Sequence, residues 1–156
     1  APGTVQYRSP SRRTLLTDAL VRSVQRQAGR VVSHEVDPAQ PETLVRALAE
    51  LLPTGAVQRE DAAAWVAFGA AASTRPWLAD PYWEALQIMR TWVEGILTDA
   101  RKAGRMRVDL SPAEGARLVT AVVNGLTLDL LNAPPTEADE VIGQLRSGLG
   151  LILRGL

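Results

Sequence analysis

The sequence predicts an all-α protein, and three observations favour this fold class. Apolar residues recur three and four positions apart, which is the spacing of one face of a helix. No segment alternates apolar and polar residues between turn signals as a strand does. Proline, glycine and capping residues divide the chain every few helical turns. With 156 residues, 46% of them apolar, the chain can form one compact domain, and we expect an antiparallel helical bundle.

The first three helices are predicted from their boundary residues. Ser11 is a suitable N-cap for a helix over 12–32. Pro41 suits the first turn of a second helix, which should end near Leu52, just before a proline and a glycine. The apolar spacing predicts a third helix over 58–72.

The last three helices have equally clear boundaries. Asp80 is expected to cap a long central helix over 81–104, which begins with a proline and closes at a glycine suited to a left-handed cap. Ser111 begins the sequence Ser-Pro-Ala-Glu, which has the spacing of a capping box and predicts a helix over 112–132. After two consecutive prolines, Thr136 should cap a last helix that continues almost to the final residue.

Composition argues against catalysis. Cysteine is absent and His34 is the only histidine, so cysteine zinc sites, iron–sulfur sites and thiol nucleophiles are excluded. No glycine-rich phosphate loop occurs either. We expect His34 to be solvated beside Glu35, and Glu60 and Asp61 to complement the dipole of a helix start. The sequence therefore predicts no enzyme activity, no metal and no cofactor.

Charge and hydropathy give the expected location. Basic and acidic residues number 17 each, so the net charge names no partner. No apolar run approaches the roughly 20 residues that a membrane-spanning helix needs, and the N-terminus lacks the apolar core of a signal peptide. We expect a cytoplasmic protein with no membrane partner.

The last two helices carry more apolar surface than one stripe. Apolar residues spread around the helix over 112–132, and the last helix has no later segment to cover it. A homodimer in which both helices pair across a two-fold axis is the simplest cover. The alternative is a larger monomeric core. The residues expected at the dimer interface are Leu118, Val122, Gly125, Leu126, Leu145, Leu149 and Ile152.

Six of the seven aromatic residues lie between Trp65 and Trp92. Large rings beside small residues leave room in a bundle core, so we hypothesise a pocket for a largely apolar or aromatic small molecule. Polar groups such as Thr120 or Gln87 could orient it. The alternative is that the rings simply fill the core. The residues expected to bind the ligand are Trp65, Phe68, Trp83, Ile88, Met89, Trp92 and Asn124.

The beginning of the chain resembles a known family. Residues 3–12 read Gly-Thr-Val-Gln-Tyr-Arg-Ser-Pro-Ser-Arg and lead into the first long helix. This resembles the TetR-family repressors, whose recognition helix Gly-Thr-Val-Gln-Tyr passes through His-Phe-Pro-Ser-Lys into the helix that links the DNA-binding and sensor parts. The segment 97–109, which precedes Ser111 and Pro112, and the segment 123–126 are similar to BetI-like C-terminal sensor domains.

The resemblance implies two parts and a set of DNA contacts. Residues 1–11 would be a remnant of the helix-turn-helix, namely its recognition helix, and residues 12–156 a helical ligand-binding and dimerisation domain. The two preceding helices of the family motif do not occur in this sequence, so we expect operator DNA to be bound through the complete N-terminal domain. The residues expected to meet DNA are Gly3, Thr4, Gln6, Tyr7 and Arg12.

The resemblance and the expected pocket together predict a ligand-responsive transcriptional regulator. The favoured form is a repressor that a small apolar or aromatic effector releases from its operator. One alternative is a helical carrier or scavenger of hydrophobic molecules that never touches DNA. Another is a dimerisation module with a filled core.

Overall fold

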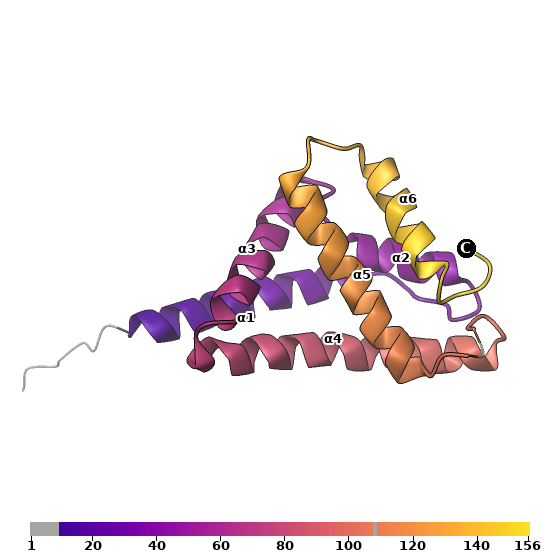
Figure 1. The fold of residues 1–156 in the computed structure, drawn as a ribbon, viewed down its shortest axis with the longest axis horizontal. Coiled ribbons are helices and arrows are strands. Elements are labelled where there is room, and N and C mark those ends of the chain that lie inside the picture. The colour runs from indigo at the N-terminus through magenta and orange to yellow at the C-terminus, as the bar shows by residue number, and fades with distance from the viewer. Residues whose placement is uncertain (1–9, 108) are drawn as a thin grey trace, which may run out of the picture.

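The computed structural model describes residues 10–107 and 109–156. The prediction of an all-α fold is confirmed, because the only strand-like pairing in this part of the chain is one isolated bridge between Met106 and Leu153. The described residues form six helices, which are α1 (Arg12–Val32), α2 (Pro41–Ala49), α3 (Ala56–Ala72), α4 (Pro76–Lys102), α5 (Pro112–Asn132) and α6 (Ala138–Leu149) (Figure 1).

Helices α1 and α5 have the predicted bounds because local chemistry fixes their starts. The Ser11 hydroxyl accepts a hydrogen bond from the backbone N–H of Thr14 at 3.2 Å. At α5 the Ser111 hydroxyl accepts from the Glu114 N–H at 3.2 Å, and the Glu114 carboxylate accepts from the Ser111 N–H at 2.9 Å. This is the predicted capping box.

Helix α4 begins earlier than predicted. It starts at Pro76, so Asp80 is not its cap and Pro81 lies inside the helix. Pro76 suits a first turn as well as Pro81 does, and burial of Leu78 against α1 and α3 stabilises the added turn. Because proline has no N–H, Pro81 cannot donate the usual helical bond to the carbonyl of Trp77.

Helix α6 is shorter than predicted, and its N-cap position is Glu137 in place of Thr136, with no capping hydrogen bond from the side chain. After Leu149 the chain turns and runs beside the connection between α4 and α5. The Arg107 N–H donates to the carbonyl of Ile152 at 3.1 Å, and the Arg154 N–H donates to the carbonyl of Arg105 at 2.7 Å. These bonds satisfy backbone groups that a longer helix would have paired internally.

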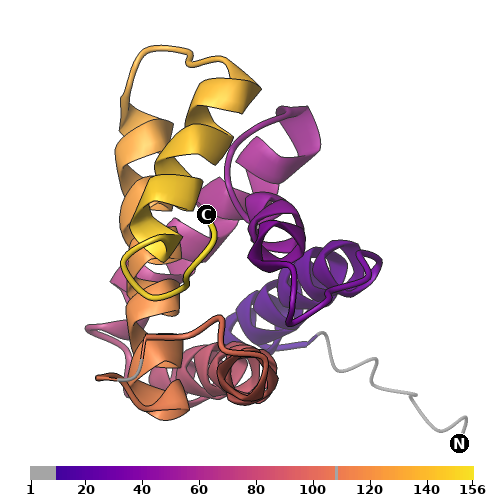
Figure 2. The same cartoon turned by 90° about the vertical axis from the view of Figure 1, so that its right-hand side faces the viewer.

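The helices are arranged in crossing pairs. Helices α1 and α4 extend along the molecule, while α3 and α5 cross them (Figure 1). Helix α6 lies beside α5 and also packs on α2 (Figure 2). The larger buried core joins α2, α4, α5 and α6, and a smaller cluster of Leu20, Ala72 and Leu78 joins α1, α3 and α4.

Two glycines shape the contact between α4 and α5. Gly104 follows α4 with φ of +71°, the left-handed conformation expected after a helix. A Cβ on Gly115 would lie 2.8 Å from Leu97 Cδ1 and 2.9 Å from Met106 Cε. Glycine at this position therefore allows the first turn of α5 to pack closely on α4.

Candidate functional site

A cavity of about 170 Å³ lies between α1, α3, α4 and α5, with the end of α2 closing one side. Its walls are almost entirely apolar, and none of the lining side chains is ionisable. Helix α1 contributes Val24, Gln27, Ala28, Val31 and Val32, and α2 with its following turn contributes Leu48 and Leu51. The remaining lining residues are Trp65 of α3, Ala85, Leu86, Ile88, Met89 and Trp92 of α4, and Val119, Thr120, Val123, Asn124 and Thr127 of α5.

The structure brings five of the seven residues predicted for ligand binding to this cavity. They are Trp65, Ile88, Met89, Trp92 and Asn124. Their common location follows from helical spacing, since Ile88, Met89 and Trp92 lie within one turn of α4. Whether a ligand binds them stays a prediction.

Phe68 and Trp83 lie elsewhere, which corrects the prediction for these two residues. Phe68 lines a separate open groove between the starts of α1 and α4 and the end of α3. Trp83 is 53% exposed, and the guanidinium of Arg90 lies 5.2 Å from its ring. Trp83 is six positions before Met89 on α4, so it projects from a different face of the helix. Gln87 is also exposed and is not a lining residue.

The wall from α1 was missed by the sequence analysis. Leu20, Val24, Gln27 and Val31 recur at helical spacing, and this stripe was the available signal. Gln27 is the polar member of this stripe. In the structure Gln27 is buried and lines the cavity.

Trp65 is held from two sides. Its indole N–H donates to Asn124 Oδ1 at 3.0 Å, and its ring stacks on Tyr82 with centroids 4.3 Å apart. A Cβ on Gly69, one turn further along α3, would lie 2.8 Å from the Tyr82 hydroxyl oxygen. Burial raises the pKa of Tyr82 despite the charge of Arg90, so its hydroxyl stays neutral. This arrangement fixes the indole as a wall of the cavity.

Four lining residues are polar, and two of them are already satisfied. The Thr127 hydroxyl donates to the carbonyl of Val123 at 2.7 Å. The Thr120 hydroxyl donates to the carbonyl of Arg117 at 3.0 Å and accepts from Arg90 Nε at 3.2 Å. The other two are the amides of Gln27 and Asn124, and each has one end with no hydrogen-bond partner among the described residues.

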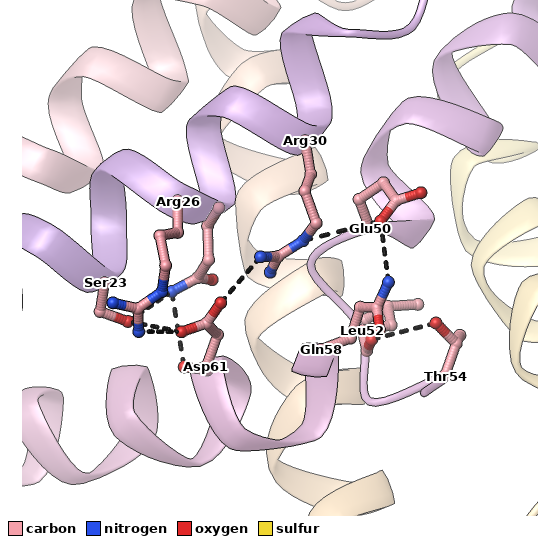
Figure 3. A network of polar contacts seen from close by, with 9 residues as sticks. Ser23, Arg26, Arg30, Glu50, Leu52, Thr54, Gln58 and Asp61 are labelled. Carbon is pink, nitrogen blue, oxygen red and sulfur yellow. Dashed lines mark hydrogen bonds and ion pairs between the residues drawn. The ribbon is translucent and has the colours of Figure 1, made fainter. Parts of the chain in front are cut away.

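A buried carboxylate beside the cavity joins α1 to α3. The Asp61 side chain is 2% exposed and accepts hydrogen bonds from Ser23 Oγ at 3.2 Å, Arg26 Nη2 at 2.6 Å and Arg30 Nη1 at 2.8 Å (Figure 3). Burial alone would raise the pKa of Asp61. The hydrogen bonds and charges of the two arginines outweigh that effect and hold the pKa below its ordinary value. Asp61 is therefore ionised and does more than complement a helix dipole.

The polar contacts continue from Arg30 to the end of α2. Arg30 Nε lies 3.7 Å from Glu50 Oε2, which accepts from Gln58 Nε2 at 3.0 Å (Figure 3). Glu50 Oε1 lies 3.1 Å from His34 Nε2, so His34 pairs with Glu50 and is not simply solvated beside Glu35. Burial opposes ionisation of Glu50, but the bonds from Gln58 and His34 hold its pKa below the ordinary value.

Of the residues predicted to meet DNA, Gly3, Thr4, Gln6 and Tyr7 lie outside the described residues. Arg12 is exposed at the first position of α1. Next to it, the Arg13 guanidinium lies 5.5 Å from the ring centroid of Trp77. The start of α1 is therefore basic and open to solvent.

The predicted dimer residues divide into two groups. Leu118 and Gly125 are exposed, and Val122 and Leu126 are partly buried, so these four lie on or near the outer side of α5. Leu145, Leu149 and Ile152 are buried in the core of the single chain. The prediction is corrected for these three, because side chains sealed between α2, α5 and α6 have no surface to offer a partner.

Among the described residues, no group of three or more histidine, aspartate or glutamate side chains could hold one metal ion. No helix in the described ranges is long and apolar enough to cross a bilayer.

Comparison with known proteins identifies relatives by sequence and by fold. Residues 38–154 match the family described as BetI-type transcriptional repressor, C-terminal. No curated protein matches the chain. A transcriptional regulator from Saccharomonospora viridis, in complex with choline, superposes with a TM-score of 0.80 at 27% identity, covering 97% of this chain and 80% of its own.

Two other solved structures show the same architecture. A transcriptional regulator from Rhodococcus sp. Rha1 has a TM-score of 0.79 at 25% identity and covers 94% of this chain and 76% of its own. A TetR transcription regulator from Haloarcula marismortui shares the fold at 15% identity, with a TM-score of 0.74, covering 97% of this chain and 84% of its own. Since the family match spans most of the described helices, the chain belongs to the TetR family of transcriptional regulators and has a BetI-type C-terminal domain.

Proposed function

We propose that this protein is a transcriptional repressor that releases operator DNA when a small, uncharged apolar or aromatic effector enters the cavity. One observation carries the proposal. Helix α1 lines the cavity through Val24, Gln27 and Val31, and its first residue follows directly on the segment that resembles a recognition helix. An effector in the cavity therefore touches the helix that leads back to the DNA-binding region.

The effector must act through a difference in affinity. A ligand shifts a regulator only if it binds the DNA-free arrangement more tightly than the DNA-bound one, typically by about 1–3 kcal/mol. Helix α1 packs on α3 and α4, which supply the aromatic walls. A guest that displaces Trp65 or Gln27 changes how α1 sits on those helices, and this supplies the required difference.

The cavity wall favours an uncharged effector. Its lining contains two tryptophans, a methionine and aliphatic side chains, and no carboxylate that would neutralise a cation. The regulator from Saccharomonospora viridis holds choline, and aromatic faces such as those of Trp65 and Trp92 can bind a quaternary ammonium group. Choline is therefore the competing effector that a test must include.

We assign DNA contacts to Gly3, Thr4, Gln6, Tyr7 and Arg12, with Thr4, Tyr7 and Arg12 on phosphates and Gln6 at a base edge. Hydroxyl and guanidinium groups suit phosphate oxygens, while an amide can read adenine.

We also propose a homodimer through the outer face of α5. Leu118, Ala121, Val122, Gly125 and Leu128 recur at helical spacing along this face. Leu118 is 45% exposed and Leu128 is 49% exposed, which favours cover by a second copy.

Fluorescence anisotropy of the natural full-length protein on DNA from beside its own gene tests the proposal. The titration is run across salt concentrations, without compound and with neutral single-ring aromatics or choline. We expect the protein to bind this DNA sequence-selectively. A neutral aromatic compound should release the protein from the DNA, and choline should not. Selective binding that no compound alters would contradict effector control.

A matched pair of variants locates the effect. Ala85→Phe places a ring in the cavity, whereas Ala63→Phe places the same ring on the exposed side of α3. Only the first should abolish release by the compound. If compounds bind the cavity but no DNA is bound selectively at any salt concentration, the protein is a carrier of hydrophobic molecules and not a repressor.

A further inference from the structure

The Asn124 amide has a fixed orientation. An indole N–H can only donate, so the 3.0 Å contact from Trp65 requires the oxygen of Asn124 to face Trp65. The amide nitrogen then points away from the indole. Its two N–H groups have no hydrogen-bond partner among the described residues, and Asn124 lines the cavity.

The Gln27 amide has the opposite orientation, and Asp61 determines it. The Ser23 hydroxyl gives its proton to the Asp61 carboxylate, so Ser23 Oγ accepts from Gln27 Nε2 at 3.3 Å. The same nitrogen donates to the backbone carbonyl of Asp61 at 3.4 Å, an atom that can only accept. The Gln27 oxygen is therefore the end left without a partner in the described part of the chain.

Both atoms reach open space. In the described residues, the buried side-chain nitrogens and oxygens that lack a hydrogen-bond partner are Nε and Nη2 of Arg30. Asn124 Nδ2 and Gln27 Oε1 are not among these sealed atoms, and both residues line the cavity. They come from α5 and α1, which each pack on α3 and α4. The cavity thus offers a donor from one wall and an acceptor from another.

The volume of the cavity suits a guest of one ring. An apolar cavity of about 150 Å³ can hold benzene, and this cavity measures about 170 Å³. The faces of Trp65 and Trp92 and the side chain of Met89 suit a flat aromatic body. A charged group would lose its hydration here without an ionised partner.

We propose that the cavity binds a neutral, single-ring aromatic compound with one donor and one acceptor, such as a hydroxyl that donates to Gln27 Oε1 and a carbonyl that accepts from Asn124 Nδ2. This inference rests on the proposed function only in taking the cavity as the effector site. A bare hydrocarbon would leave both amide ends unsatisfied, so it binds more weakly.

Calorimetric titration of the full-length protein with four related probes tests the assignment. The probes are 4-hydroxyacetophenone, acetophenone, 4-ethylphenol and ethylbenzene, which offer both groups, the carbonyl alone, the hydroxyl alone and neither. We expect affinity to rise by roughly three- to tenfold for each hydrogen bond gained. Equal affinity for all four probes, or no binding of any, overturns the proposal.

Two variants assign the bonds to their residues. Asn124→Leu should abolish the higher affinity of acetophenone relative to ethylbenzene. It should leave the higher affinity of 4-ethylphenol relative to ethylbenzene unchanged. Gln27→Met should do the reverse. Gln87→Met makes the same change on the exposed side of α4 and should alter neither. Helical circular dichroism confirms that each variant is folded. A uniform loss of affinity for all four probes in both variants also contradicts the assignment.

The DNA-binding assay separates this inference from the proposed function. If the probes bind in the expected order but none changes DNA affinity, the assignment of a donor and an acceptor to the cavity is supported. The proposal that an effector in the cavity controls DNA binding is then contradicted. If choline alone binds the protein and causes it to release DNA, control by an effector is supported. The assignment of a neutral guest with one donor and one acceptor is then contradicted.

Discussion

Asp61 on α3 and Arg30 on α1 lie in contact beside the cavity, with Asp61 Oδ2 2.8 Å from Arg30 Nη1. Arg30 is largely buried and Asp61 almost completely so, and both helices contribute walls of the cavity. The pair therefore fixes the position of α1 relative to the aromatic wall, and it connects the stability of the fold to the geometry of the site.

Asp61→Asn should destabilise the protein markedly. Removing one partner of a buried ion pair typically costs about 3–5 kcal/mol, and we expect about 3 kcal/mol because Arg26 is half exposed and can be rehydrated. Urea unfolding followed by circular dichroism measures the change. The control is Asp99→Asn, since Asp99 pairs with Lys102 on the surface, and it should cost less than about 0.5 kcal/mol. Equal losses in the two variants would show that the Asp61 contacts contribute little.

The contribution of Asp61 should also depend on pH. Its pKa is lower in the folded protein than in the unfolded chain, so its stabilisation is complete above the unfolded value of about 4. It is lost as the pH falls through the lower folded value. The difference in unfolding free energy between wild type and Asp61→Asn should thus be constant at about pH 5–7 and shrink below about pH 4. A difference that grows on acidification would contradict this sign.

Gly69→Ala should impair the site more than the fold. Alanine in place of glycine within a helix normally stabilises by about 1 kcal/mol, but this Cβ would lie 2.8 Å from the Tyr82 hydroxyl and push that ring off Trp65. We expect little net change in stability and a several-fold loss of affinity for 4-hydroxyacetophenone in calorimetry. Gly95→Ala is the control, because nothing lies within 4 Å of its Cβ. It should stabilise the protein and leave probe affinity unchanged.

Glu42 and Arg146 hold α2 to α6 through two hydrogen bonds of 2.6 and 2.9 Å, although they lie 104 residues apart in the sequence. Both side chains are more than one-third exposed. Glu42→Gln should therefore destabilise by no more than about 1 kcal/mol. Because exposed ion pairs are screened, the loss should shrink as salt is raised from about 0.05 to 1 M. Thermal unfolding across salt concentrations checks this, and a loss independent of salt would contradict it.

Leu118→Glu should convert the proposed dimer into monomers. The substitution places a charge on the outer face of α5, where two copies would meet. Sedimentation velocity measures the mass. Val57→Glu, at an exposed site on α3, should leave the dimer intact. A wild-type monomer at all concentrations would remove the dimer proposal.

Sequence predicted the fold best where local chemistry decides structure. Ser11 and Ser111 cap their helices with their own side chains, so the starts of α1 and α5 could be predicted. Pro76 and Pro81 are both compatible with a first helical turn. Burial of Leu78 against α1 decides between them, and this long-range contact has no local signature.

The site was predicted in part for a similar reason. Trp65, Met89 and Trp92 stand out in the sequence as large rings and a flexible apolar side chain at helical spacing. Gln27 and Asp61 do not, because a glutamine or an acid on a helix usually faces solvent. Their roles depend on the packing of α1 on α3, which brings the Gln27 side chain into hydrogen-bond contact with the backbone carbonyl of Asp61, 34 residues away.

Pro81 has a mechanical consequence for α4. A helix is stiff because each turn is bonded to the next, and the bond that Pro81 cannot donate leaves one compliant joint in a 27-residue rod. Tyr82, stacked on Trp65, is the next residue after this joint, and Leu78, packed against α1, lies before it. The first turn of α4, which packs on α1, is therefore joined to the rest of the helix by one backbone hydrogen bond fewer, directly before the residue that stacks on the indole.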